Sequence, residues 1–183
     1  MDTSDIRKGL KFMINDQPHV VIDFQFVKPG KSQAFTRTKL KNMLTGQVSE
    51  QTWKSGEKLE PADVEERNLQ YVYPEETDFV FMDTNSGEQL SVSVDTVGED
   101  SRWLSDGMMV GVTLFKGRPI GISLPNQVVL QIVSLEPTDD SQPTQQAIVS
   151  TGATLAVPKL LKVDDWIKID TTTGTYLERI AKR

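Results

Sequence analysis

The chain has 183 residues, of which 37% are hydrophobic and 25% are charged, and it carries a formal net charge of −6 and no cysteine. This composition indicates a soluble globular protein, and no run of about 18 apolar residues suggests a membrane span. Without cysteine, disulfides, thiolate metal sites and cysteine nucleophiles are excluded. The first residues contain no apolar stretch typical of a signal peptide, so we expect a cytoplasmic protein.

The first distinctive element is a pair of strand-like runs joined by Lys28-Pro29-Gly30-Lys31. Proline fixes φ at the second position of a turn, and glycine accepts a positive φ at the third. The sequence therefore predicts a type II turn at a hairpin tip. The Lys31 side chain should then extend into solvent, although a surface hairpin with two solvated lysines would give the same pattern.

Charge is distributed unevenly along the chain. Between Phe24 and Ser49 there are five cations and no acid, the cations being Lys28, Lys31, Arg37, Lys39 and Lys41. Residues 1–64 hold ten Lys/Arg and eight Asp/Glu, whereas residues 65–183 hold ten and eighteen. The chain is therefore acidic with one basic projection, where a phosphate-rich partner would bind.

Short β-branched or aromatic runs, separated by turn signals, make up most of the chain. Strands are predicted at residues 19–22, 34–40, 79–82, 109–115, 128–133 and 166–169, and turns at 15–16, 85–87, 116–117 and 173–174. This spacing is typical of small barrels or sandwiches. Only short helical segments are expected, near residues 61–66 and 101–104, and the polar residues 136–146 predict a loop.

Two seams, near residues 60–67 and 125–127, divide the chain into residues 1–64, 65–127 and 128–183. The first seam is charged and contains proline, and the second contains Pro125-Asn126. Both are signals of a break between strand groups.

The chemical inventory indicates a protein that is not an enzyme and needs no cofactor or metal. Gly30-Lys31-Ser32 resembles the end of a phosphate-binding loop, but Gln25 stands where that loop needs glycine, and a strand rather than a helix follows. His19 is the one histidine, which leaves no histidine metal site or catalytic dyad. The acid pairs Asp139-Asp140 and Asp164-Asp165 lie in polar sequence, as solvated loop residues do.

The three tryptophans, Trp53, Trp103 and Trp166, could stack on bases, as aromatic residues do on small barrels. Their positions favour packing in the protein core instead. Trp166 begins an alternating run typical of a half-buried strand.

The segment 26–35, which contains the lysine turn, is followed by Leu44-Thr45-Gly46, Pro125-Asn126 and the stretches 149–158 and 167–176. In their order and spacing, these motifs resemble those of bacterial elongation factor P. The resemblance implies an all-β fold of three small barrels in series, elongated and bent. The first would be an SH3-like N-terminal domain carrying the basic tip, and the other two would be OB-fold domains.

The resemblance also implies a function. It indicates a translation elongation factor that binds the ribosome beside peptidyl-tRNA, promotes peptide-bond formation and relieves stalls at consecutive prolines. Lys31 matches the position that a lysine-modifying enzyme modifies in the family, often with a β-lysyl group. The implied tip site comprises Lys28, Pro29, Gly30, Lys31, Ser32 and Gln33, and the candidate RNA contacts are Arg37, Lys39, Tyr176 and Arg179. A monomer with no DNA or membrane partner is expected.

The chain departs from the family pattern at several positions. Ser32 and Asp164 stand where glycine is common, and Gln145 stands where lysine is common. Residues 136–146 lack the Gly-Asp-Thr stretch associated with the exit-site codon, so that contact is not carried over. Two alternatives stay open: a general single-strand RNA-binding OB protein, which the acidic residues 65–183 disfavour, and a divergent paralogue with an unmodified tip.

Overall fold

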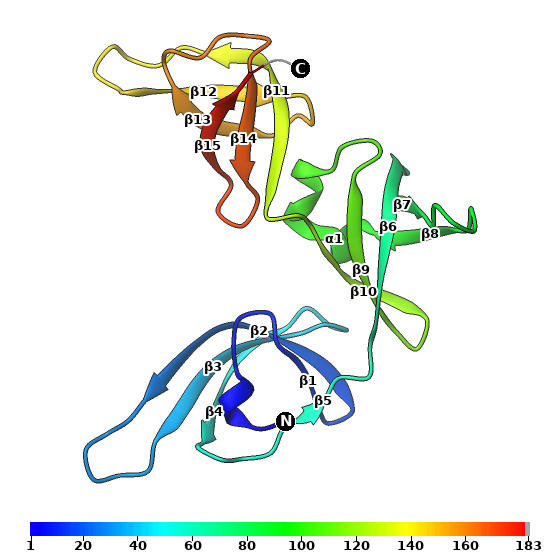
Figure 1. The fold of residues 1–183 in the computed structure, drawn as a ribbon, viewed down its shortest axis with the longest axis vertical. Helices are drawn as coiled ribbons and strands as arrows, with labels where there is room; N and C mark the ends of the chain where they lie inside the picture. The colour runs from blue at the N-terminus through cyan, green and yellow to red at the C-terminus, as the bar shows by residue number, and fades with distance from the viewer. Residues whose placement is uncertain (182–183) are drawn as a thin grey trace. The chain divides into compact units, whose positions relative to one another are not determined.

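The computed structural model describes residues 1–181, which form three antiparallel β-sheets of five strands each (Figure 1). The predicted all-β fold is confirmed. The chain divides into two compact units, one comprising Met1–Arg67 and Thr113–Gly121, the other Asn68–Val112 and the chain from Ile122 onward. No helix among the described residues is long and apolar enough to cross a membrane.

The first sheet follows a short 3-10 turn at Thr3–Asp5 and has the strand order β4-β3-β2-β1-β5. Its strands are β1 (Lys11–Ile14), β2 (Gln17–Val27), β3 (Phe35–Asn42), β4 (Val48–Lys54) and β5 (Glu60–Pro61). Positive φ angles of 51° and 61° at Asn15 and Asp16 form the predicted turn between β1 and β2. The core contains Ile6, Phe12, Val21, Leu40 and Leu59, with Trp53 packed edge-on against Phe12.

The second sheet has the order β10-β9-β6-β7-β8. Its strands are β6 (Glu65–Pro74), β7 (Asp78–Met82), β8 (Gln89–Ser93), β9 (Met109–Phe115) and β10 (Arg118–Ser123). The helix α1 (Val94–Val97) and the 3-10 segment η2 (Gly98–Trp103) connect β8 to β9. The helical segment predicted at residues 61–66 is wrong, because β5 pairs with β1 and β6 begins at Glu65. The turn predicted near 101–104 overlaps η2.

The third sheet has the order β13-β12-β11-β14-β15. Its strands are β11 (Gln127–Glu136), β12 (Thr144–Val149), β13 (Thr154–Pro158), β14 (Trp166–Asp170) and β15 (Thr175–Ile180). The first half of β11 pairs with β14 and the second half with β12, with an irregularity between Ile132 and Ser134. The loop predicted at 136–146 is shorter than expected, because Thr144–Gln146 pair with β13.

Trp103 comes from the connection within the second sheet but is buried in the core of the third. It is 0% exposed and clusters with residues from β11 to β14, among them Leu130, Val149 and Ile169. Its predicted packing role is confirmed. Trp53 is also packed, and Trp166 is half-buried on β14, as its alternating run predicts.

Candidate functional site

The candidate site is the connection between β2 and β3, which extends beyond the ends of both strands (Figure 1). The last cross-strand pair is Val27 with Phe35, so residues 28–34 form a loop outside the ladder. Lys28, Gly30, Lys31, Ser32 and Gln33 are exposed, and Pro29 is half-buried. The structure therefore brings the predicted tip residues together at one projecting loop.

The predicted type II turn is wrong in its geometry. Gly30 does not have the positive φ that the third position of such a turn requires. In a tight turn, Lys28 would lie opposite Lys31 and the strands would stay paired up to these residues. Instead, pairing ends at Val27 and Phe35, and the Ala34 carbonyl accepts a hydrogen bond from the Ser55 amide (3.0 Å), which lies outside the hairpin. The wider loop still leaves Lys31 in solvent, as expected.

The base of the loop is held by residues from elsewhere in the first unit. Besides the Ser55 amide, the Gln33 side chain donates to the Ser55 carbonyl at 3.4 Å. The next residue, Gly56, donates its amide to the Thr3 hydroxyl (2.9 Å), and the Thr3 side chain is buried. The far side of the loop is thus tied through the end of β4 to the N-terminal turn.

Neither lysine of the loop has an ion pair or a side-chain hydrogen bond within the part of the chain that the structure describes. An added Cβ at Gly30 would meet nothing within 4 Å. The Lys31 ammonium group is therefore free to contact an external partner, and the loop around it is open to one.

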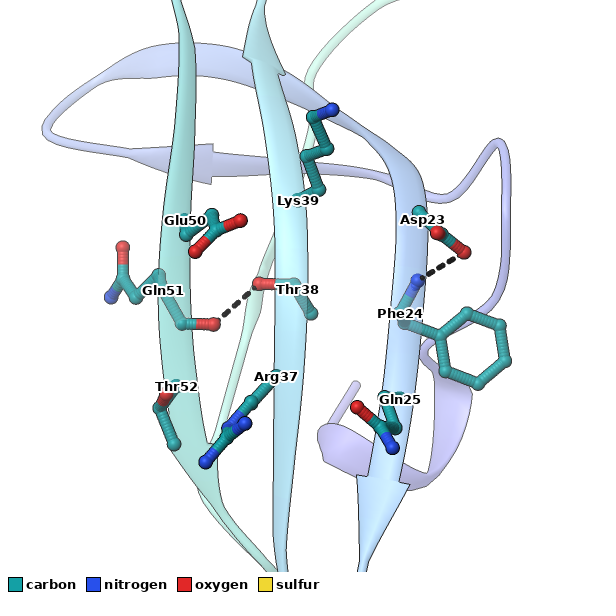
Figure 2. Close-up of a pocket in the computed structure, with 9 residues that line it drawn as sticks. All are labelled: Asp23, Phe24, Gln25, Arg37, Thr38, Lys39, Glu50, Gln51 and Thr52. Carbon is teal, nitrogen blue, oxygen red and sulfur yellow. Dashed lines mark hydrogen bonds between the residues drawn. The ribbon is translucent and has the colours of Figure 1, made fainter.

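Below the loop, one face of the sheet presents three rungs of side chains from β2, β3 and β4. From the loop downward they are Val27–Phe35–Lys54, Gln25–Arg37–Thr52 and Asp23–Lys39–Glu50. The lower two rungs line an open hollow of about 380 Å³, in which Lys39 lies between the two acids (Figure 2). Formal charge changes from +1 in each of the upper rungs to −1 in the third.

At the third rung, the sheet is less basic than the sequence predicted. Asp23 and Glu50 flank the run of five cations in sequence, but strand pairing places them directly opposite Lys39. Opposed charges on neighbouring strands attract at this separation and reduce the field that Lys39 presents to an anion. Of the candidate RNA contacts on β3, Arg37 keeps an unopposed charge and Lys39 does not.

The upper rung adds a cation that the sequence analysis missed. Lys54 is opposite Phe35 and lies on the same face as Arg37, although it is far from the cationic run in sequence. Lys54 can be placed on this face only when the register of β3 against β4 is known. The sequence alone does not give that register.

Comparison with known proteins places this geometry in a family. Three family models match consecutive parts of the chain: the elongation factor P KOW-like domain (residues 2–59), the elongation factor P OB domain (64–122) and the elongation factor P C-terminal domain (128–179). The chain belongs to the elongation factor P family.

Relatives of elongation factor P match along the full length of the chain. Elongation factor P 2 of Geobacter sulfurreducens is 42% identical over 97% of both chains. Elongation factor P of Gloeobacter violaceus is 43% identical over 98% of both. A solved structure of translation initiation factor 5A from Methanococcus jannaschii covers 68% of this chain and 93% of its own, at 20% identity and a TM-score of 0.48.

The elongation factor P resemblance also singled out residues of the third sheet. Tyr176 on β15 is half-buried against the core of that sheet. Arg179 is exposed but its Nη2 lies 3.4 Å from Oδ1 of Asp165. A contact between Arg179 and RNA would therefore compete with an internal ion pair.

Two departures from the elongation factor P pattern have structural roles. Gln145 donates to the carbonyls of Pro158 (3.3 Å) and Leu161 (3.0 Å), so its amide holds the loop after β13. Asp164 has φ 77°, a conformation that glycine adopts without cost and aspartate tolerates. Neither substitution points to a change in RNA binding.

Among the described residues, no group of three or more His, Asp or Glu side chains could hold a metal ion. The polar side chains at the loop and on the three rungs are exposed lysine, arginine, carboxylate, amide and hydroxyl groups. The arrangement can bind and orient an anionic partner, and it contains no nucleophile activated by a base.

Proposed function

We propose that this protein is a translation elongation factor that binds the ribosome beside peptidyl-tRNA and promotes peptide-bond formation, which relieves stalls at consecutive prolines. Membership of the elongation factor P family supports the assignment to translation. The observation that carries the proposal is Lys31, an exposed cation that pairs with no described residue and lies on a projecting loop whose base is tied to the N-terminal turn.

The proposed mechanism is positioning. Proline is a poor nucleophile in a rigid ring, so the slow step is the alignment of two bulky substrates. Holding peptidyl-tRNA in a productive pose lowers the entropic part of the barrier. Lys31 supplies a compact cation with three donors, which suits contacts to phosphate and sugar oxygens near the tRNA 3′ end. No side chain of the factor has to transfer a proton.

We further propose that Lys31 is the modified residue. A group added to its amine would extend the donors beyond the reach of the lysine side chain. The exposure of Lys31, and the open space next to Gly30, leave room for a modifying enzyme to reach the amine.

A binding comparison tests this function against general RNA binding. The native protein should cosediment with ribosomes that hold peptidyl-tRNA and should bind an unstructured oligoribonucleotide far more weakly. The reason is that residues 65–183 carry eight more acids than bases and would repel a bare strand. Equal affinity for the oligonucleotide, or no association with ribosomes, would overturn the proposal.

A further inference from the structure

We infer that Arg37 and Lys54 together form a phosphate-binding surface for the tRNA whose 3′ end the tip approaches, and that Lys39 takes no part in it. This inference rests on the proposed function and names further residues of the same site. It assigns a role to Lys54, which lies outside the cationic run, and withdraws one from Lys39, which lies inside it.

The upper two rungs hold cations without a carboxylate opposite. Lys54 faces Phe35, which in turn faces Val27, and Arg37 lies between Gln25 and Thr52. Together with Lys28 and Lys31 in the loop, they make the end of the hairpin positive over two rungs and the loop. An RNA strand approaching from the tip would therefore meet the loop lysines and the cations of the two upper rungs before it meets the acids of the third rung.

The Arg37 side chain is held in place by its neighbour. The guanidinium carbon lies 5.5 Å from the centre of the Phe35 ring, within the range of a cation–π contact. The contact leaves the edge of the guanidinium able to donate to phosphate oxygens, for which its planar fork is suited. A side chain oriented in this way loses less conformational entropy when it binds.

Lys54 is exposed, and its ammonium group has no ion pair among the described residues. The Glu57 carboxylate accepts a hydrogen bond from the backbone amide of Lys54 (3.3 Å) and forms no ion pair with its ammonium group. Lys54 and Arg37 are diagonal neighbours on adjacent rungs, where Cα atoms are about 7–8 Å apart. Two long side chains that start this close together on one face can both contact the phosphates of one RNA strand.

The third rung marks the end of the surface. A phosphate at Lys39 would lie next to both Asp23 and Glu50, which stand on either side of it (Figure 2). The Lys8 Nζ lies 3.9 Å from Oδ1 of Asp23 and offsets part of that negative charge. Because Lys8 is already paired with Asp23, it adds no free cation for a phosphate. An anion therefore gains little at this rung, and the cationic surface stops one rung above it.

Matched glutamine variants test the inference. Arg37→Gln and Lys54→Gln should each weaken binding to ribosomes that hold peptidyl-tRNA by about three- to eightfold near 0.1 M salt. Each should also reduce the slope of log affinity against log salt by about one. Lys39→Gln, which removes the same charge from the same sheet face, should leave affinity and slope close to those of the wild type. Equal losses for all three variants, or none for Arg37→Gln and Lys54→Gln, would overturn the inference.

Two further arms separate the causes. With ribosomes whose peptidyl site is empty, the losses at Arg37 and Lys54 should disappear; losses that persist would show that the ribosome itself is the partner and would contradict the assignment to tRNA. All three side chains are exposed, so each variant should keep the wild-type fold, and the loss of the Arg37 cation–π contact or of the charge attractions of Lys39 should lower the unfolding midpoint only slightly. If Lys31→Ala abolishes function while Arg37→Gln and Lys54→Gln bind normally, the inference fails and the proposed function stands. If the wild type does not bind ribosomes at all, the proposed function itself fails.

Discussion

Replacing Lys31 by alanine should reduce translation through consecutive prolines to the level of cells that lack the protein. The substitution removes the cation that the tip would bring to the tRNA 3′ end, and the other exposed lysine of the loop, Lys28, follows the last paired residue of β2 and so lies at the base of the loop. Because the side chain contacts no other residue through a hydrogen bond or ion pair in the described structure, folding should be unaffected. The measurement is the yield of a reporter downstream of a proline run, with Lys31→Ala as the only copy of the factor.

Two variants serve as controls for this result. Lys162→Ala removes an exposed lysine from the loop between β13 and β14. Cells with this variant should translate the reporter normally. Lys31→Arg keeps the positive charge but lacks the amine that a modifying enzyme would use, and should behave like Lys31→Ala if the modification is required. Normal reporter yield from Lys31→Ala would defeat the main proposal, while full activity of Lys31→Arg would point to a factor with an unmodified tip.

Replacing Trp103 by alanine should lower the free energy of unfolding of the second unit by about 3–5 kcal/mol. The side chain is 0% exposed and fills the core of the third sheet from a segment that belongs to the second. Its loss would leave a large cavity and also remove the cation–π contact with Arg102, whose guanidinium carbon is 4.9 Å from the ring centre. The measurement is equilibrium denaturation followed by circular dichroism.

Two other substitutions calibrate the effect of Trp103→Ala. Trp103→Phe should cost much less, because it keeps most of the ring volume and removes a buried indole N–H that has no hydrogen-bond partner among residues 1–181. Trp166→Ala, at a half-buried position on β14, should also cost less. A Trp103→Ala protein as stable as the wild type would show that the core does not depend on this side chain.

The strands were predictable because their alternation is local. On β3, the residues Thr36, Thr38, Leu40 and Asn42 are buried and the residues between them are exposed, the period of two that the sequence displays. The exposure of Lys31 was predictable for a related reason, since a Pro-Gly pair between two such runs has to leave the sheet.

The type of turn was not predictable, because residues distant in sequence decide it. Proline and glycine favour a type II turn locally. However, the Ser55 amide donates a hydrogen bond to the Ala34 carbonyl, and the β2–β3 ladder ends at Val27. The helix expected at residues 61–66 failed for the same reason, since β5 exists only by pairing with Phe12 and Met13 of β1.

The charge on the hairpin face also depended on register. In sequence, Lys39 belongs to an uninterrupted cationic run, whereas in the sheet it lies between Asp23 and Glu50. Lys54 is the opposite case. It is isolated from other cations in the sequence, but in the sheet it lies on the same face as Arg37. A shift of one residue in the pairing would have moved every one of these side chains to the other face.

The central claim is that residue 31 reaches the 3′ end of peptidyl-tRNA on the ribosome. The chain contains no cysteine, so Lys31→Cys creates a single attachment point for an iron chelate that cleaves nearby RNA. When this derivative is bound to ribosomes that hold peptidyl-tRNA, cleavage should be confined to the last nucleotides of that tRNA and the ribosomal RNA next to them. A probe on Ser141→Cys, in the loop between β11 and β12, should cleave elsewhere. Cleavage from position 31 that spares the tRNA 3′ end, while the protein remains bound, would contradict the account.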